Sequence, residues 1–216
     1  MTAKPHLSSA PPADAPSEAA PSRHDLLAEL GRAAAAGDAD ALERLLRSLG
    51  PDMLRVIRSV LGAKHADLDD LVQDCLLAFI RALTQFRFES SVSTFALTIA
   101  FRHALAAKRR QRDIARWIDT FARLHEPLMA AGDSPANDVE VERKRALVAD
   151  LLTTIPKPQA EALGLRAVVG LSIDEIAHNT GVPANTVRSR LRLAKESLRR
   201  SIETDPELRD FLEPLR

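Results

Sequence analysis

The sequence predicts an all-α protein made of two small helical domains joined by a flexible linker. Apolar residues recur at intervals of three and four along most of the 216 residues, as they do on one face of an α-helix. No segment shows the two-residue alternation that is typical of a half-buried β-strand. A stretch rich in turn residues separates two patterned regions. We therefore expect a disordered arm (1–23), a first domain (24–113), a linker (114–138), a second domain (139–202) and an acidic tail (203–216).

The first domain is predicted from leucine-rich helical patterns. Between residues 24 and 62 the pattern is interrupted at Gly37-Asp38 and at Gly50-Pro51, which indicates short packed helices. The clearest helix covers 67–83, where the apolar side chains share one face. A further helix, from about 93 to 112, becomes basic only in its last turns.

The second domain is predicted from helix start and stop signals. A helix that begins near Val139 closes at Ile155-Pro156, and the next runs from about Pro158 to Val169. The residues Ser172-Ile173-Asp174-Glu175 have the pattern of a capping box, which fixes the start of a short helix. A turn at Gly181-Val182-Pro183 ends that helix, and a longer one follows.

Composition excludes several classes of protein. No apolar run approaches the roughly 20 residues that cross a bilayer, and the N-terminus lacks a hydrophobic signal segment, so we expect a cytoplasmic chain without membrane insertion. The single cysteine, Cys75, excludes an internal disulfide, and its apolar helical position predicts a small buried hydrophobe. The histidines are scattered and no phosphate-binding loop is present, so we expect no metal, no cofactor and no enzymatic activity.

The formal net charge of zero is a cancellation between patches. Residues 101–116 carry six cations against one acid, and residues 187–200 also carry six against one. Acids gather instead in 67–74 and in 203–213. Local basic patches favour nucleic-acid binding even where the whole chain is neutral.

The segment 172–200 has the pattern of a helix-turn-helix, whose second helix enters the DNA major groove. Arg188 and Arg192 lie one turn apart, and an arginine can pair with guanine through two hydrogen bonds. A charged surface helix on a bundle is the less favoured interpretation. The predicted DNA-binding residues of this helix are Asn185, Thr186, Arg188, Ser189, Arg190, Arg192 and Lys195.

The polar face of the helix 67–83 carries a small cluster of acid, amide and apolar side chains: Asp70, Gln73, Asp74 and Leu77. Aspartates would repel DNA, so this cluster fits a protein partner better. A solvated acidic face near a helix N-terminus, favoured by the helix dipole, explains it as well.

Two parts of the sequence resemble the bacterial sigma-70 family of RNA polymerase sigma factors, most closely its small extracytoplasmic-function (ECF, group 4) type. The first part, which resembles sigma region 2, is DDLVQD (69–74) followed by FRFESSVSTF (86–95) and the basic helix end. The second part, which resembles sigma region 4, is IP (155–156) through GLSIDEIA (170–177) and GVPANTVRSRL (181–191).

The resemblance covers about residues 38–112 and 140–202, in the order that the family has. Two positions depart from its pattern. Phe95 stands where many members carry tryptophan, and Asp74 stands where glutamate is usual. Both replacements keep the chemical character of the side chain.

The resemblance implies a subunit that binds core RNA polymerase and directs promoter-specific transcription initiation. Region 4 would recognise the −35 element in the major groove, and the cluster from Asp70 to Leu77 would bind core polymerase. Region 2 would recognise and melt the −10 element, where aromatic rings and hydroxyls hold unstacked bases and cations hold the adjoining phosphates. The residues implied at the −10 element are Phe86, Phe88, Ser90, Ser91, Ser93, Lys108, Arg109, Arg110 and Arg112.

The resemblance also implies a further partner, and the sequence leaves two alternative functions open. Members of this group are often held by an anti-sigma factor, so the resemblance implies such a partner, with the apolar face between the two domains as its target. One alternative is an autonomous dimeric helix-turn-helix regulator that does not need core polymerase. Another is a protein-only module that sequesters a regulator. Core polymerase distinguishes them, because only a sigma factor would yield promoter-specific transcripts when added to it.

Overall fold

The structure is a computed structural model that describes residues 22–63, 65–123, 147 and 149–204. This part of the chain consists of helices and turns without a strand, so the predicted all-α class is confirmed. Residues 149–154 are helical. The other helices are α1 (Arg23–Ala35), α2 (Ala39–Leu61), α3 (Leu68–Leu83), α4 (Val92–Arg123), α6 (Lys157–Gly164), the π-helical turn η1 (Leu165–Val169), α7 (Ile173–Thr180) and α8 (Ala184–Thr204).

Side-chain caps fix the starts of the first two helices. Ser22 Oγ and Asp38 Oδ1 each accept a hydrogen bond from the backbone N–H three residues later, at 3.2 and 3.0 Å. Gly37, with a φ of 100°, makes the turn between these helices, as the sequence indicated. Helix α1 begins at Arg23, which we had placed in the arm, and residues 1–21 lie outside the described part.

Helix α2 continues through Gly50-Pro51, where we expected a break. Leu45, Leu49, Met53 and Ile57 follow one another at four-residue intervals and are fully buried. A proline inside a helix costs about 3 kcal/mol. Burying four such side chains contributes about 1.5–3 kcal/mol each, which outweighs that penalty.

Helix α3 buries the face that the sequence predicted. Cys75 and Phe79 on that face have no exposed surface. Burial raises the pKa of the Cys75 thiol to about 12, so it remains protonated and unreactive at neutral pH. The interpretation of Cys75 as a buried hydrophobe is confirmed.

Helix α4 is longer than expected, because it covers 92–123 rather than 93–112. Residues 114–123, which we assigned to the linker, are therefore helical. They contain neither glycine nor proline, and the turn signals behind our assignment begin only at His125-Glu126-Pro127. The rest of the expected linker, 124–138, lies outside the described residues, as do residues 205–216 of the expected tail.

The C-terminal helices follow the predicted start and stop signals. The expected helix 158–169 is present, but its second half is the π-helical turn η1, which Gly170 closes with a φ of 85°. The capping box is confirmed, because Ser172 Oγ accepts from Glu175 N–H at 3.2 Å and Glu175 Oε2 accepts from Ser172 N–H at 2.8 Å. The backbone bond from Ser172 is the main cause that lowers the pKa of Glu175.

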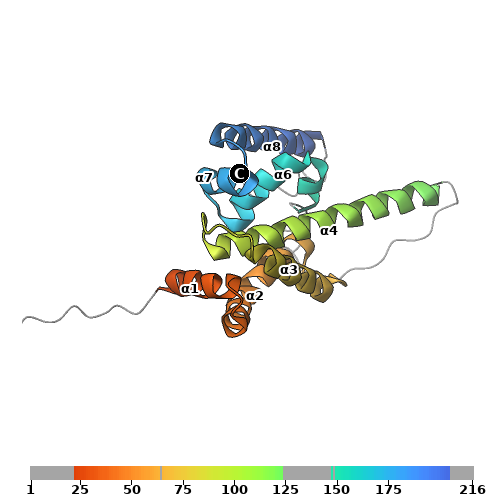
Figure 1. Cartoon of the computed structure of the whole chain (residues 1–216). Coiled ribbons are helices and arrows are strands. Elements are labelled where there is room, and N and C mark those ends of the chain that lie inside the picture. The colour runs from red at the N-terminus through yellow and green to blue at the C-terminus, as the bar shows by residue number, and fades with distance from the viewer. Residues whose placement is uncertain (1–21, 64, 124–146, 148, 205–216) are drawn as a thin grey trace, which may run out of the picture.

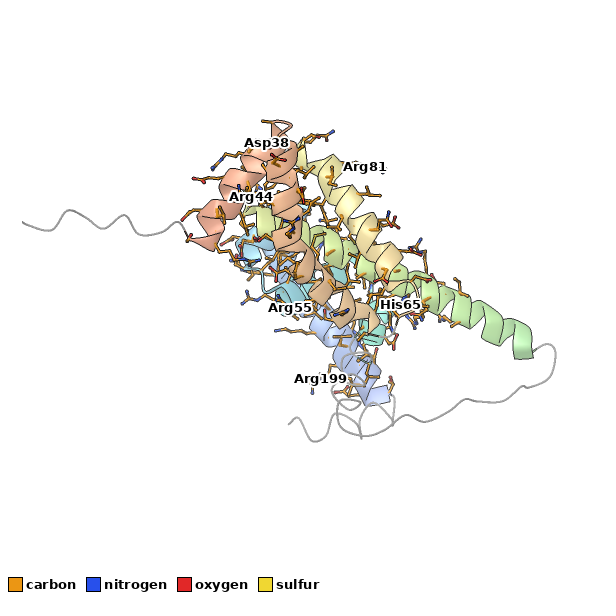
Figure 2. The ribbon with its side chains drawn as sticks, turned by 90° about the horizontal axis from the view of Figure 1, so that it is seen from below. Asp38, Arg44, Arg55, His65, Arg81 and Arg199 are labelled. Carbon is orange, nitrogen blue, oxygen red and sulfur yellow. The ribbon has the colours of Figure 1, made fainter. Side chains whose placement is uncertain are left out.

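Helices α1–α3, from the N-terminal half of the chain, lie on one side of α4, and helices α6–α8, from the C-terminal half, lie on the other (Figure 1). Seen from below, α1, α2 and α3 lie in front of α4 (Figure 2). Buried residues of both halves form one continuous core. The ring of Phe101 on α4, which is fully buried, lies close against Gly164 at the end of α6. A Cβ on Gly164 would lie 1.8 Å from Phe101 Cζ, so only glycine fits this contact.

Candidate nucleic-acid interface

Helix α8 is positioned by α7 and by the turn between them. Ile176 of α7 and Val187 of α8 are fully buried. Gly181 adopts a left-handed φ of 66°, and the Val182 N–H donates to the Ala177 carbonyl at 3.1 Å, which closes the turn. Buried anchors and a closed turn hold α8 as a rigid element, which a helix entering a DNA groove requires.

The exposed face of α8 contains most of the DNA-binding residues predicted from the sequence. Asn185, Arg188, Ser189 and Arg192 follow helical spacing and are exposed. Arg188 Nη1 donates to Asn185 Oδ1 at 2.8 Å, so these two side chains are oriented together. Lys195, one turn beyond Arg192, is also exposed.

Two of the predicted residues on α8 differ from the rest. Thr186 and Arg190 are half-buried and belong to another side of the helix.

Arg192 lies 3.6 Å from Glu196, with both side chains more than half exposed. A surface pair of this kind contributes about 0–1 kcal/mol, so Arg192 can exchange Glu196 for another anion or a base.

The polar face of α3 is exposed, as the helical period predicted. Asp70, Gln73, Asp74 and Leu77 are all accessible, and Leu77 is 43% exposed. Helical spacing places them together on the side away from Cys75.

A groove of about 760 Å³ runs between α3 and α4 beside this polar face. Asp70 and Asp74 line it from α3, and Arg110, Gln111 and Ile114 line it from α4. Ile114 is 59% exposed. Sequence reasoning missed Gln111 and Ile114, although an isoleucine among polar residues just after the basic run was an available signal.

The aromatic side chains of the connector 86–95 form a stacked group. The rings of Phe86 and Phe95 are 4.3 Å apart and inclined by 15°, and Phe88 lies 4.8 Å from Phe86. All three are half-buried and pack against the core. Phe88 has a positive φ of 56°, which is unusual for a bulky residue.

The serines of the connector have different environments. Ser91 Oγ accepts from the Thr94 N–H at 3.0 Å and donates to Thr94 Oγ1 at 2.9 Å, so it caps the start of α4. Ser90 lines a pocket of about 340 Å³, together with Phe86 and Phe95. Ser93 is half-buried in the first turn of α4.

The four cations that we assigned to −10 DNA, hereafter the basic segment, do not share one surface. Lys108 pairs with Asp150 Oδ1 at 3.0 Å, and only 11% of its side chain is exposed. Arg112 Nη1 donates to Thr153 Oγ1 at 3.1 Å. Arg110 is instead exposed toward the groove beside α3.

Arg109, the central cation of the basic segment, binds the C-terminal half of the chain. Its Nη2 donates to the carbonyls of Ile155 at 2.9 Å and Leu152 at 3.3 Å. These carbonyls lie at the end of the helical residues 149–154, where a cation is favoured. Burial lowers the pKa of the guanidinium, and its Nε is buried without a hydrogen-bond partner among the described residues.

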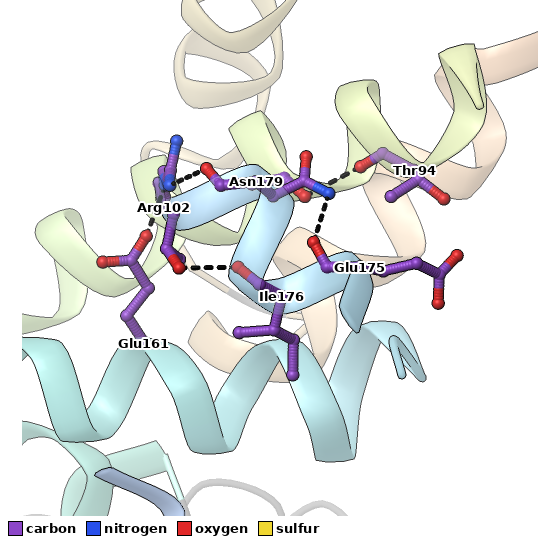
Figure 3. A network of polar contacts seen from close by, with 8 residues as sticks. Thr94, Arg102, Glu161, Glu175, Ile176 and Asn179 are labelled. Carbon is purple, nitrogen blue, oxygen red and sulfur yellow. Dashed lines mark hydrogen bonds and ion pairs between the residues drawn. The ribbon is translucent and has the colours of Figure 1, made fainter. Parts of the chain in front are cut away.

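A further cation, Arg102, joins α4 to both α6 and α7 (Figure 3). Arg102 Nε donates to Glu161 Oε1 at 2.5 Å, and Arg102 Nη2 donates to the Asn179 carbonyl at 2.9 Å. His178 Nε2 of α7 lies 3.2 Å from Glu89 Oε2 in the connector. Sequence reasoning missed these contacts, because no pattern within one segment indicates which distant segment it will meet.

Comparison with known proteins decides the family. The protein family described as "Sigma-70 region 2" matches residues 45–114, and the family described as "Sigma-70, region 4" matches residues 145–198. The ECF RNA polymerase sigma factor SigC of Mycobacterium tuberculosis is 33% identical over 178 residues, covering 82% of this chain and 91% of that protein.

The chain belongs to the ECF type of the sigma-70 family. The ECF RNA polymerase sigma-E factor of Escherichia coli K12 is 30% identical over 145 residues, covering 63% of this sigma factor and 74% of the relative. The solved structure of CnrH in complex with the cytosolic domain of CnrY has a TM-score of 0.54 at 24% identity, and the match covers 84% of this chain and 99% of that chain. That likeness supports the fold alone.

As a sigma factor, the chain directs transcription by RNA polymerase, and nothing supports the alternative of an autonomous regulator. The region 2 match contains α3, the connector and the basic segment, and the region 4 match contains α7 and most of α8. Within the described ranges, no helix is long and apolar enough to cross a membrane. The same ranges hold no group of three or more side chains suited to a metal ion.

Proposed function

We propose that this sigma factor places its two regions on two promoter elements. Region 4 recognises the −35 element by inserting α8 into the major groove, with Arg188 and Arg192 toward base edges and Lys195 toward phosphate. The observation that carries the proposal is the exposed face of α8, which lies within a region 4 match that follows a region 2 match in the same chain.

Region 2 recognises and melts the −10 element through the connector 86–95. Stacking of a base on an aromatic ring contributes about 1–3 kcal/mol. The half-buried rings of Phe86 and Phe95 line a pocket with Ser90, which supports a role in holding an unstacked base. Phe88 and Ser93 lie between the lining residues in sequence, and Ser91 contributes by capping α4. The basic segment then holds adjoining phosphates.

Core polymerase binds the polar face of α3. Asp70, Gln73, Asp74 and Leu77 are exposed together, and the neighbouring groove offers both charge and the apolar surface of Ile114. A mixed surface of this kind is typical of protein interfaces. The role is that of a non-enzymatic initiation factor, which acts in the cytoplasm because its proposed partners, core polymerase and promoter DNA, are there.

An anti-sigma factor is a further proposed partner. We expected its target to be the apolar face between the two domains. In this structure that face is covered by the packing of Phe101 against Gly164. An anti-sigma factor that uses it would therefore compete with the chain's own packing.

Reconstituted transcription tests the proposed function. The purified chain is added to core polymerase on genomic DNA, and the transcript starts are sequenced. We expect starts that share a −35 and a −10 element at fixed spacing, absent with core enzyme alone. Random starts, or no stable complex with core polymerase, would contradict the proposal.

A further inference from the structure

We propose that α1 is part of the single-strand-binding surface of region 2, and that Arg32 on this helix holds a phosphate of the strand whose base the connector captures. The inference rests on the proposed function of the connector 86–95. It adds a DNA-binding residue that precedes residues 45–114, which the region 2 family matches, and it gives Phe88 the role of positioning that residue.

Helix α1 lies beside the connector and the first turn of α4 (Figure 1). Gly31 is buried at this contact, and a Cβ there would lie 2.7 Å from Val92 Cγ2 and 3.3 Å from Phe88 Cε1. Glycine therefore lets the backbone of α1 approach both side chains closely. Leu27 and Leu30 anchor the same helix in the core, so the last turn of α1 is fixed relative to the connector.

The guanidinium of Arg32 lies over the ring of Phe88, with its Cζ 5.7 Å from the ring centroid. A cation–π contact uses the positive charge and consumes no N–H donor. The side chain is exposed, and within the described part of the chain its guanidinium has neither a hydrogen bond nor an ion pair. Arg32 is therefore an oriented cation whose donors are available to a phosphate.

The backbone and ring of Phe88 fix the place of this cation. Its φ of 56° is unusual for a bulky residue, and such a conformation persists only where the surrounding structure holds it. The ring contacts Phe86 at 4.8 Å, yet Phe88 is not among the residues that line the pocket proposed for an unstacked base. Phe88 therefore serves as a platform for Arg32, and the rings of Phe86 and Phe95 are left to hold the base.

The basic segment begins too far along α4 to hold the phosphate nearest to that base. At 1.5 Å per residue, Lys108 lies about 24 Å along the helix from Val92. Successive phosphates of a B-DNA strand are about 3.4 Å apart along the axis, so about seven of them fit that distance. Arg32 is joined through Phe88 to Phe86, a ring that lines the pocket. Aromatic rings with a cation beside them are typical of single-strand-binding surfaces.

The experiment compares the wild type with Arg32→Ala, Arg32→Lys and Arg44→Ala. Arg44 is the matched control, because it is an exposed cation of the neighbouring helix α2 and belongs to none of the proposed binding surfaces (Figure 2). All three substitutions lie at exposed positions, so the free energy of unfolding, measured with urea, should change little.

Each chain is titrated, alone and in complex with core polymerase, with a fluorescent single-stranded 20-nucleotide DNA of random sequence at several salt concentrations. The phosphate contribution to binding is independent of sequence, so this probe suffices. Core polymerase without the chain gives the background. The titration of the chain alone keeps the test independent of whether core polymerase binds.

We expect Arg32→Ala to reduce the slope of log affinity against log salt by about 0.7, the contribution of one phosphate contact on single-stranded DNA. At 0.1 M salt this loss corresponds to about fivefold weaker binding. Arg32→Lys keeps the charge and should keep the slope, and Arg44→Ala should match the wild type. An unchanged slope in Arg32→Ala, an equal loss in Arg44→Ala, or no binding by the wild type in either form would overturn the proposal.

A double-mutant cycle tests the role of Phe88. Phe88→Leu keeps an apolar side chain and removes the ring, so it should weaken DNA binding, by no more than Arg32→Ala does. Added to Arg32→Ala it should have no further effect, because both substitutions act through the same phosphate contact. Additive losses would show that Phe88 contacts the strand itself, which would overturn its positioning role.

Transcription by the wild type with core polymerase, measured alongside, tests the proposed function separately. If transcript starts were random while Arg32→Ala still lowered the salt slope, the proposed function alone would be contradicted. If the starts shared promoter elements while Arg32→Ala bound DNA like the wild type, this inference alone would be contradicted.

Discussion

At the residue scale, the function of each cation depends on the partners that it already has. Arg188 and Arg192 are exposed, and among the described residues their polar partners are Asn185 and Glu196 of the same helix. Arg109 has no such freedom, since it binds two backbone carbonyls of the other half of the chain. The sequence placed all of them in basic patches, and only the structure separates the accessible cations from the engaged ones.

Replacing Arg188 and Arg192 together by alanine should abolish transcription from a matched promoter while binding to core polymerase persists. Each arginine that pairs with a guanine contributes about 1–3 kcal/mol of discrimination, so the double variant should lose at least tenfold in promoter occupancy. Run-off transcription and a core-binding titration measure the two effects. Arg199→Ala, which removes an exposed cation paired with Glu203 further along α8, is the control. An equal loss of core binding would count against the assignment.

Replacing Asp70 and Gln73 by alanine should have the opposite effect. Core association should weaken about tenfold or more, because both side chains belong to the exposed face proposed for the polymerase. The free energy of unfolding should stay within about 0.5 kcal/mol of the wild type, as is usual for exposed residues. Asp69→Ala, at an exposed position of the same helical turn, is the matched control. A similar loss in the control would show that only the acidity of the turn matters.

At the element scale, the sequence predicted what local chemistry decides. The buried face of α3 follows from its period, and the start of α7 follows from Ser172 and Glu175. The break expected at Pro51 was wrong, because the turn signal was local while the four buried side chains around it belong to a long-range core. The contact of Arg102 with Glu161 was unpredictable for the same reason, since helical period shows which side is buried and not what covers it.

Ser172→Ala should lower the free energy of unfolding by about 1 kcal/mol at neutral pH, because it removes one of the two bonds of the capping box. The pKa of Glu175 lies below its ordinary value of 4.5, chiefly through the backbone bond from Ser172. Its contribution to stability is therefore complete above about pH 4.5 and is lost as the pH falls through the lowered pKa. Urea unfolding of the wild type and of the Ser172→Ala variant, at pH 7 and at pH 3, measures the difference in their free energy of unfolding. If the difference in free energy of unfolding between the wild type and the variant grew on acidification, the proposed role of the ionised Glu175 would be contradicted.

At the scale of the whole molecule, the two sigma regions form one packed body in which α4 is the common wall. Region 2 and region 4 share a continuous core, and Arg102 and Arg109 of α4 add hydrogen bonds to the C-terminal helices. The proposed function places these two regions on two different promoter elements. The packing between the regions therefore bears on the proposed function as well as the DNA contacts do.

Arg102→Glu should loosen the packing of α6 and α7 against α4, because it removes the bond to the Asn179 carbonyl and places a second carboxylate beside Glu161. Adding Glu161→Arg restores an opposite-charge pair and should restore part of this packing. The coupling free energy between Arg102 and Glu161 is expected to stay below about 1 kcal/mol, since Arg102 is substantially exposed. Energy transfer between dyes on α2 and α8 measures both variants. Failure of the second substitution to reverse the first would show that the ion pair itself is not responsible.

The backbone of Phe88 carries a consequence for ligand capture. Its left-handed φ of 56°, its ring contact with Phe86 and the stacking of Phe86 on Phe95 restrict the connector before any nucleotide arrives. The rings therefore lose their conformational entropy when the chain folds, and not when a base binds. An incoming base would meet a preorganised surface, and association would carry a smaller entropic penalty than with a mobile loop.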